Sequence, residues 1–187
     1  MAQKSCYAAI GLAMALACQP AVSQTKSEPG KPAPVGADPQ STTANYGDWV
    51  VRCQHVGDAA TGRRVCEVAQ IIQMQGGQGP VAQIAVGRLA AADPLRLTIV
   101  LPPNVSFPSS PRLAVDDKDA LPADLSWRRC LPGGCFADIE IKDDLLQRWR
   151  SQSAQGIIKF KDSAGRDITL PFSFRGFAQA LDALAKS

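Results

Sequence analysis

Histidine is almost absent from this chain, because His55 is the only one among 187 residues. A serine or cysteine nucleophile activated by histidine would have to use it. It follows Cys53 by two residues, beside an expected turn, where an ordinary surface residue is the simpler interpretation. The sequence also lacks an H-E-x-x-H motif, a Walker loop, a G-x-S-x-G motif and a Rossmann fingerprint. These absences argue against the common hydrolase and nucleotide-binding classes, and we predict no catalytic residue and no cofactor.

Clusters of metal ligands are equally scarce. The acidic stretch Asp116–Asp119 offers oxygen atoms, but it lacks the spacing and the closing glutamate of a calcium-binding EF-hand. A solvated turn is the better interpretation, and no metal site is predicted. Paired carboxylates for glycoside hydrolysis depend on a distance in space, so the sequence does not exclude them, although nothing points to them.

The chain also lacks a strong charge of either sign. It has 20 Lys and Arg against 17 Asp and Glu, a net charge of +3. A balance so close to neutral does not suggest nucleic acid as the main partner.

A long hydrophobic run is missing as well. The N-terminal apolar stretch Cys6–Ala17 is shorter than the ~20 residues that span a bilayer. It follows Lys4 and precedes small residues at Ala21 and Ser23, which predicts a signal peptide over residues 1–23. The alternative is a lipoprotein acylated at Cys18. The mature chain is then exported without a transmembrane segment.

Residues 24–44 contain four prolines and no apolar periodicity, which predicts a Pro-rich disordered linker. Residues 45–187 remain as one domain of ordinary size.

Four cysteines lie in this domain, and an even number in an exported chain favours disulfides. Three pairings are possible. Local geometry favours Cys53 with Cys66 and Cys130 with Cys135, because Pro132-Gly133 suits the centre of a type II turn. Zinc binding requires short spacings in both pairs, and a redox motif requires C-x-x-C. Neither pattern is present.

The domain shows the period-2 alternation of antiparallel strands, for example at 95–101 and 135–141. About nine short strands predict an all-β sandwich or barrel. Two short helices are expected, at 143–152 and 176–186, the second with an apolar stripe that suits the domain's own core. A tryptophan precedes the first cysteine of each pair, which hints weakly at an internal duplication.

One group of side chains suggests a binding surface. If folding brings them together, four arginines and two tryptophans form a basic patch flanked by aromatic rings, suited to phosphate, sulfate or carboxylate groups. The alternative is a rim of charges around a tryptophan core. The residues are Arg128, Arg129, Arg148, Arg150, Trp127 and Trp149.

Several motifs together resemble the invasion-associated locus B (IalB) family, from about Tyr46 to the C-terminus. They are YGDWVVRC, CEVAQII, LPPNV, W-x-x-C followed by C-x-A, DLLQRW and LPFSFRGFAQALDAL. The resemblance implies an immunoglobulin-like antiparallel β-sandwich, exported by bacteria with two membranes, and it maps the four cysteines onto the family pattern. Some members are linked to entry into host cells, notably erythrocytes. The family brings no established catalytic residue.

Two classes of function follow. The first is a non-catalytic binding or adhesion module in the periplasm, at the outer membrane or secreted, with an envelope or host-surface component as its partner. The second is an unrecognised periplasmic enzyme, or an envelope-maintenance protein unrelated to invasion.

Overall fold

The computed structural model describes residues 39–58, 62–74, 76–77 and 79–187. The expected signal peptide, Cys18 and most of the expected linker lie outside these ranges. The described part from residue 39 onward belongs to a single compact unit. Within these residues, no helix is long and apolar enough to cross a membrane.

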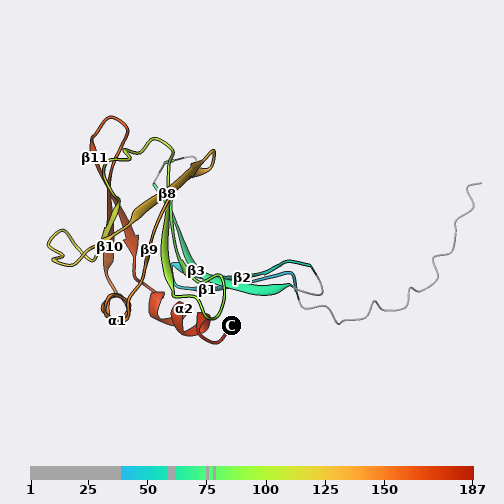
Figure 1. Ribbon diagram of the computed structural model, residues 1–187. Coiled ribbons are helices and arrows are strands. Elements are labelled where there is room, and N and C mark those ends of the chain that lie inside the picture. The colour runs from blue at the N-terminus through green and yellow to red at the C-terminus, as the bar shows by residue number, and fades with distance from the viewer. Residues whose placement is uncertain (1–38, 59–61, 75, 78) are drawn as a thin grey trace, which may run out of the picture. The chain divides into compact units, whose positions relative to one another are not determined.

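In the described part of the chain, eleven strands form two antiparallel sheets, whose arrangement Figure 1 shows. The larger sheet has the order β1-β2-β3-β4-β5-β9-β8, so its first five strands follow one another as a meander. Its strands are β1 (Ser41–Tyr46), β2 (Trp49–Val56), β3 (Arg63–Gln73), β4 (Pro80–Gly87), β5 (Arg96–Leu101), β8 (Ser126–Leu131) and β9 (Gly134–Glu140).

The smaller sheet has four strands in the order β11-β10-β6-β7. Its strands are β6 (Arg112–Ala114), β7 (Ala123–Asp124), β10 (Gln155–Lys161) and β11 (Asp167–Ser173). The inward side chains of both sheets form one core, as the alternation predicts. In β5, for example, Leu97, Ile99 and Leu101 are buried, while Arg96 and Thr98 lie on the opposite face. The predicted all-β fold of two antiparallel sheets is therefore confirmed.

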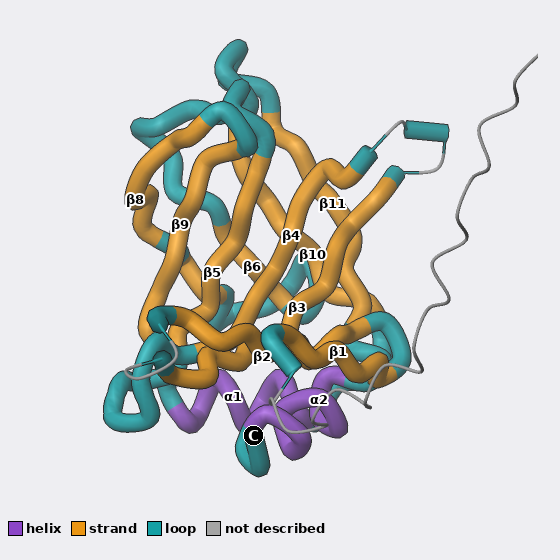
Figure 2. Tube along the Cα trace, turned by 90° about the vertical axis from the view of Figure 1, so that its right-hand side faces the viewer, coloured by secondary structure: helices purple, strands orange, loops and turns teal. Residues whose placement is uncertain are grey.

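Both expected helices are present but shorter than predicted, and they lie together at one end of the sandwich (Figure 2). Helix α1 spans Asp143–Arg150 and α2 spans Phe177–Leu184. Trp149 of α1 is completely buried, with its ring centroid 5.6 Å from that of Phe174. Phe177 of α2 is also fully buried. The apolar stripe of α2 therefore covers the domain's own core.

The first strand begins earlier in the chain than the sequence predicts. Strand β1 begins at Ser41 and pairs with β2 along its whole length, although residues 41–44 fall within the predicted linker. This strand is polar and largely exposed, so no apolar periodicity reveals it. Its main-chain hydrogen bonds to β2 determine its position, and the domain boundary predicted at Asn45 lies inside it.

Two disulfides each join a pair of neighbouring strands. Cys53 of β2 faces Cys66 of β3 with a Cα–Cα distance of 4.0 Å, so the predicted first pair is confirmed. Cys130 of β8 faces Cys135 of β9 at the same Cα–Cα distance, and the structure bonds them too. Each cysteine pair occupies directly opposite positions of an antiparallel ladder, which brings the Cα atoms close.

Candidate functional site

The predicted basic patch does not form as one group. The two arginines of α1 each have a carboxylate partner elsewhere: Arg148 binds Asp119, and Arg150 lies 2.5 Å from Asp182. Trp149 belongs to the core and offers no surface. The helix directs its tryptophan into the core and pairs each of its arginines with a carboxylate of a distant segment, so this half is not a patch of free arginines around an exposed tryptophan.

Trp127 is also removed from the proposed surface. Its indole nitrogen donates a hydrogen bond to the Ser109 carbonyl oxygen at 2.8 Å, and its ring stacks with Phe107. Arg128 and Arg129, in contrast, both line a pocket on the outer face of the seven-stranded sheet.

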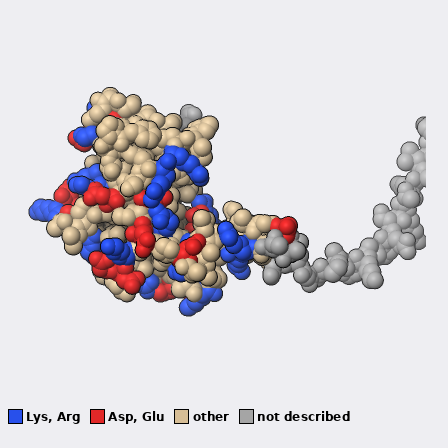
Figure 3. Space-filling view, in the orientation of Figure 1, with Lys and Arg blue, Asp and Glu red and all other residues tan. Residues whose placement is uncertain are grey.

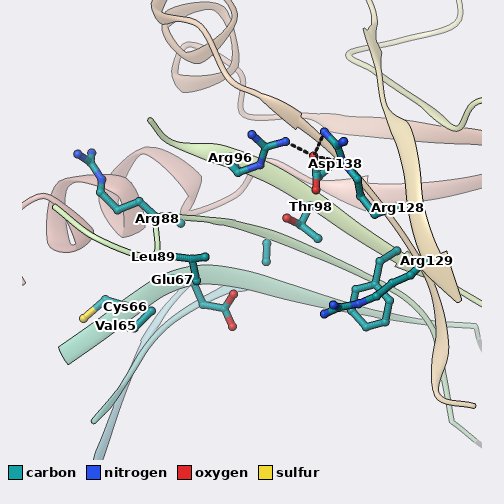
Figure 4. A pocket seen from close by; sticks show the side chains of 13 residues that line it. Val65, Cys66, Glu67, Arg88, Leu89, Arg96, Thr98, Arg128, Arg129 and Asp138 are labelled. Atoms are coloured by element: carbon teal, nitrogen blue, oxygen red, sulfur yellow. Dashed lines mark hydrogen bonds and ion pairs between the residues drawn. The ribbon is translucent and has the colours of Figure 1, made fainter. Parts of the chain in front are cut away.

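This pocket has a volume of about 500 Å³, and residues of five strands form it (Figure 4). Its floor is made of small side chains on β4 and β5, and its walls carry arginines. The lining residues are Val65, Cys66, Glu67, Ala85, Gly87, Arg88, Leu89, Arg96, Thr98, Arg128, Arg129, Phe136 and Asp138.

A β-bulge explains how two consecutive arginines reach the same pocket. Along a regular strand, successive side chains point to opposite faces. Trp127 pairs with Ala137 and Arg129 with Phe136, so Arg128 is an extra residue between two successive pairs. A bulge of this kind redirects side chains. As a result Arg128 and Arg129 both line the outer face, while Trp127 turns towards Ser109.

The pocket floor allows close approach to the sheet. Ala85 pairs with Thr98 and Gly87 with Arg96 across β4 and β5. A side chain at Gly87 would press on Glu67, because a Cβ atom there would lie 2.9 Å from the Glu67 Cβ. Because Gly87 has no side chain, the floor of the pocket beside the arginines stays close to the backbone of the sheet.

Asp138 is the electrostatic centre of the pocket. Arg128 Nη2 lies 2.9 Å from its carboxylate, and Arg96 bonds to the same oxygen. Burial disfavours the charged carboxylate, but the hydrogen bonds from Arg128 and Arg96 outweigh this effect and lower the pKa of Asp138. Asp138 therefore stays ionised at neutral pH and holds both guanidinium groups in place (Figure 4).

Positive charge remains in the pocket after these pairings. Asp138 supplies one negative charge to the two arginines that it binds, and Glu67 binds Arg52 at 2.6 Å. Arg129 lies over the ring of Phe136, 5.6 Å from its centroid, and within the described residues it has no carboxylate within ion-pair distance. Its guanidinium group is therefore available to an anion.

The other residues considered from the sequence lie elsewhere. His55 occupies an exposed position near the end of β2 and does not line the pocket. Asp119 is a structural residue: it accepts hydrogen bonds from the backbone of Val115 and Leu121 and from Arg148. Burial opposes its ionisation, yet these hydrogen bonds give a net lowering of its pKa.

Sequence reasoning missed Arg96, Phe136 and Asp138. The alternation of β5 and β9 placed Arg96 and Asp138 on polar faces, which was the available signal. That signal did not tell which strands are neighbours, so the contact between the two residues, 42 positions apart, could not be inferred.

The structure thus defines a two-sheet β-domain with disulfides between neighbouring strands and an arginine-rich pocket on one outer face. The family model for invasion associated locus B (IalB) protein matches residues 49–185. The chain therefore belongs to the IalB family. Its fold is similar to the crystal structure of invasion associated protein B from Bartonella henselae, with a TM-score of 0.63 and 22% identity over 78% of this chain and 95% of that one. Comparison with curated proteins finds no match.

Proposed function

We propose that the chain is an exported, non-catalytic binding protein that acts in adhesion to, or invasion of, host cells. The pocket around Arg128 and Arg129 is its ligand site. The observation that carries the proposal is the excess of positive charge there, above a floor of small side chains. Membership of the IalB family supports the link to invasion.

The chemistry of the pocket favours binding over catalysis. Two of its arginines hold Asp138 as a stable carboxylate with a lowered pKa, which makes it a poor general acid at neutral pH. The second carboxylate, Glu67, is occupied by Arg52. His55 lies outside the pocket, so a histidine-activated nucleophile has no partner at this site.

Two disulfides between neighbouring strands support export, because such bonds persist in oxidising compartments. Periplasmic, outer-membrane-associated and secreted locations all meet this condition. The proposed partner is an envelope or host-surface component with an anionic group, since the guanidinium of Arg129 has no ion pair within the described residues.

The test is binding of the purified mature protein to host cells, with erythrocytes first. We expect the double variant Arg128→Gln/Arg129→Gln to lose at least tenfold in binding while remaining folded. Arg112→Gln is the matched control, because its partner Asp124 lies on the smaller sheet and both side chains are more than half exposed. His55→Ala should bind like the parent protein.

Binding that survives the double substitution would exclude the pocket as the site. A deletion strain with a leaky envelope but unimpaired host-cell entry would instead select the envelope-maintenance function.

A further inference from the structure

A second, largely apolar pocket lies on the same face of the sheet, and one row of paired residues, here called the trough, leads from it to the arginine-rich pocket. The row follows from the strand register. Ile71 pairs with Gln83, Gln83 with Val100, Val100 with Phe136, and Phe136 with Arg129. This row crosses five neighbouring strands, β3, β4, β5, β9 and β8, and its side chains share one face. With strands about 4.8 Å apart, it extends roughly 19 Å.

The two ends of the row differ in chemistry. The Arg129 end belongs to the arginine-rich pocket. The Ile71 end lines a second pocket of about 300 Å³, whose lining contains no charged side chain. Ile71, Pro80, Val81, Val100, Pro102 and Pro103 supply most of its walls. Ile71 is 55% exposed although it is a large apolar residue, so the apolar end is open to a ligand.

Small residues line the trough along one side. The neighbouring row on the same face runs from Ala69 through Ala85 and Thr98 to Asp138. These side chains rise little above the sheet until the row reaches the arginine pairs of Asp138. This face of the sheet is therefore a shallow, largely uncharged surface that ends at the arginines beside Asp138.

We propose that this trough binds a single-chain lipid anion as a monomer. Its phosphate or carboxylate group lies at Arg128 and Arg129, and its hydrocarbon chain lies over Phe136, Val100 and Ile71. The inference rests on the proposed function, because it names the ligand class of the same pocket. Guanidinium groups match the oxygen geometry of either headgroup.

A peptide fits the trough less well than a hydrocarbon chain. The face of a sheet presents no free backbone groups, because its N–H and C=O groups form the ladder hydrogen bonds. A peptide lying across the strands would leave its own buried backbone groups unpaired, which is unfavourable. A hydrocarbon chain has no such groups, and it gains from covering Val100 and Ile71.

The test uses n-alkyl monophosphates below their critical micelle concentration, with isothermal titration calorimetry on the full mature protein. We expect dodecyl phosphate to bind one to one. Affinity should rise from octyl to dodecyl phosphate by up to about fourfold per added methylene, the limit set by full burial. Inorganic phosphate and dodecyl maltoside, which lack the chain and the charge respectively, should each bind at least tenfold more weakly. Dodecanoate shows whether a carboxylate serves equally well.

Two variants separate the ends of the trough. Arg129→Gln, which breaks no ion pair, should weaken dodecyl phosphate at least tenfold and leave the chain-length dependence unchanged. Ile71→Asp, at an exposed position, should weaken dodecyl phosphate at least tenfold but leave the weak binding of inorganic phosphate unaltered. Arg112→Gln should bind like the parent protein. Thermal melting confirms that each variant is folded.

Affinity independent of chain length would overturn the inference, as would binding to phosphatidylglycerol vesicles without binding to any monomer. Cell binding that depends on Arg128 and Arg129, without binding of any alkyl anion, would remove the lipid inference and leave the proposed function intact.

Discussion

At the scale of single residues, Asp138 has two opposing effects on the pocket. Its carboxylate holds Arg96 and Arg128 in fixed positions, but it also cancels part of their charge. Arg129 lies beyond its reach and faces Phe136. The pocket therefore contains arginines that Asp138 holds and arginines, Arg88 and Arg129, that have no ion pair within the described residues. Stability and anion affinity should respond to Asp138 in opposite directions.

Asp138→Asn tests this opposition. The variant loses the ion pairs with two partly exposed arginines, which should lower the free energy of unfolding by about 1 kcal/mol at pH 7. It also removes the negative charge of Asp138, which raises the net charge of the pocket by one, so dodecyl phosphate should bind about two- to fivefold more tightly. Chemical denaturation and calorimetry measure the two effects on the same sample. Weaker anion binding in a folded variant would show that positioning by Asp138 matters more than its charge.

The pH dependence supplies the control for this prediction. The folded-state pKa of Asp138 is lowered, so its contribution to stability is present above the unfolded-state pKa of ~3.9 and is lost as pH falls through the folded value. Melting temperatures of the parent and Asp138→Asn should therefore differ at pH 6 and converge towards pH 2. If the difference in melting temperature is the same across this pH range, the substitution acts through packing and not through the charge of Asp138.

At the scale of elements, the sequence was informative wherever a strand has one buried face. The alternation at β5 and β9 predicted their inward residues, and the apolar stripe of α2 predicted its packing. Strand β1 was missed because it is largely exposed and carries no apolar pattern. Strand β7 was missed because it has only two residues, Ala123 and Asp124.

The candidate site was less predictable than the fold, for physical reasons. Arg128 and Arg129 share a face because of a bulge, and two adjacent residues in a regular strand would have been expected on opposite faces. Arg96 meets Asp138 because β5 pairs with β9, although two smaller-sheet strands, β6 and β7, and then β8 intervene in the chain. A spacing pattern encodes neither event, so the arginines of β8 and α1 were grouped by sequence proximity.

The two disulfides lie next to pocket residues along their strands. Cys66 precedes Glu67 in β3, while Cys130 follows Arg129 and Cys135 precedes Phe136. Chain entropy gives each bond a stabilisation of roughly 3 kcal/mol for Cys53–Cys66 and roughly 2 kcal/mol for Cys130–Cys135. The second bond also ties the strand that carries the bulge to its neighbour.

Removing the second bond should therefore affect stability and binding together. We expect Cys130→Ala/Cys135→Ala to lose roughly 2 kcal/mol of unfolding free energy and to bind dodecyl phosphate several-fold more weakly. Cys53→Ala/Cys66→Ala should lose more stability but less affinity, because the remaining Cys130–Cys135 bond still holds the strand that carries Arg128 and Arg129. Non-reducing peptide mapping of the parent protein should find both bonds, and a Cys53–Cys130 or Cys66–Cys135 crosslink would contradict this pairing.

At the scale of the whole molecule, the two faces of the larger sheet have different surroundings. The inner face is filled by the core that it shares with the smaller sheet and the helices. The outer face carries the pocket and the apolar trough. Basic and acidic side chains are interleaved over the visible surface (Figure 3), so recognition depends on the local excess of arginine rather than on a large field of one sign.

The proposed export fits the two disulfides, because such bonds persist in an oxidising compartment. Lys4, the apolar run Cys6–Ala17 and the small residues Ala21 and Ser23 predict cleavage after Ser23. Intact-mass measurement and N-terminal sequencing of protein from the native host should therefore give Gln24 as the first residue, with all four domain cysteines oxidised. An acylated N-terminal Cys18 would select the lipoprotein alternative and place the pocket at a membrane surface. Recovery of the chain in the cytoplasm with Met1 intact would refute export, and the pocket would then need a cytoplasmic ligand.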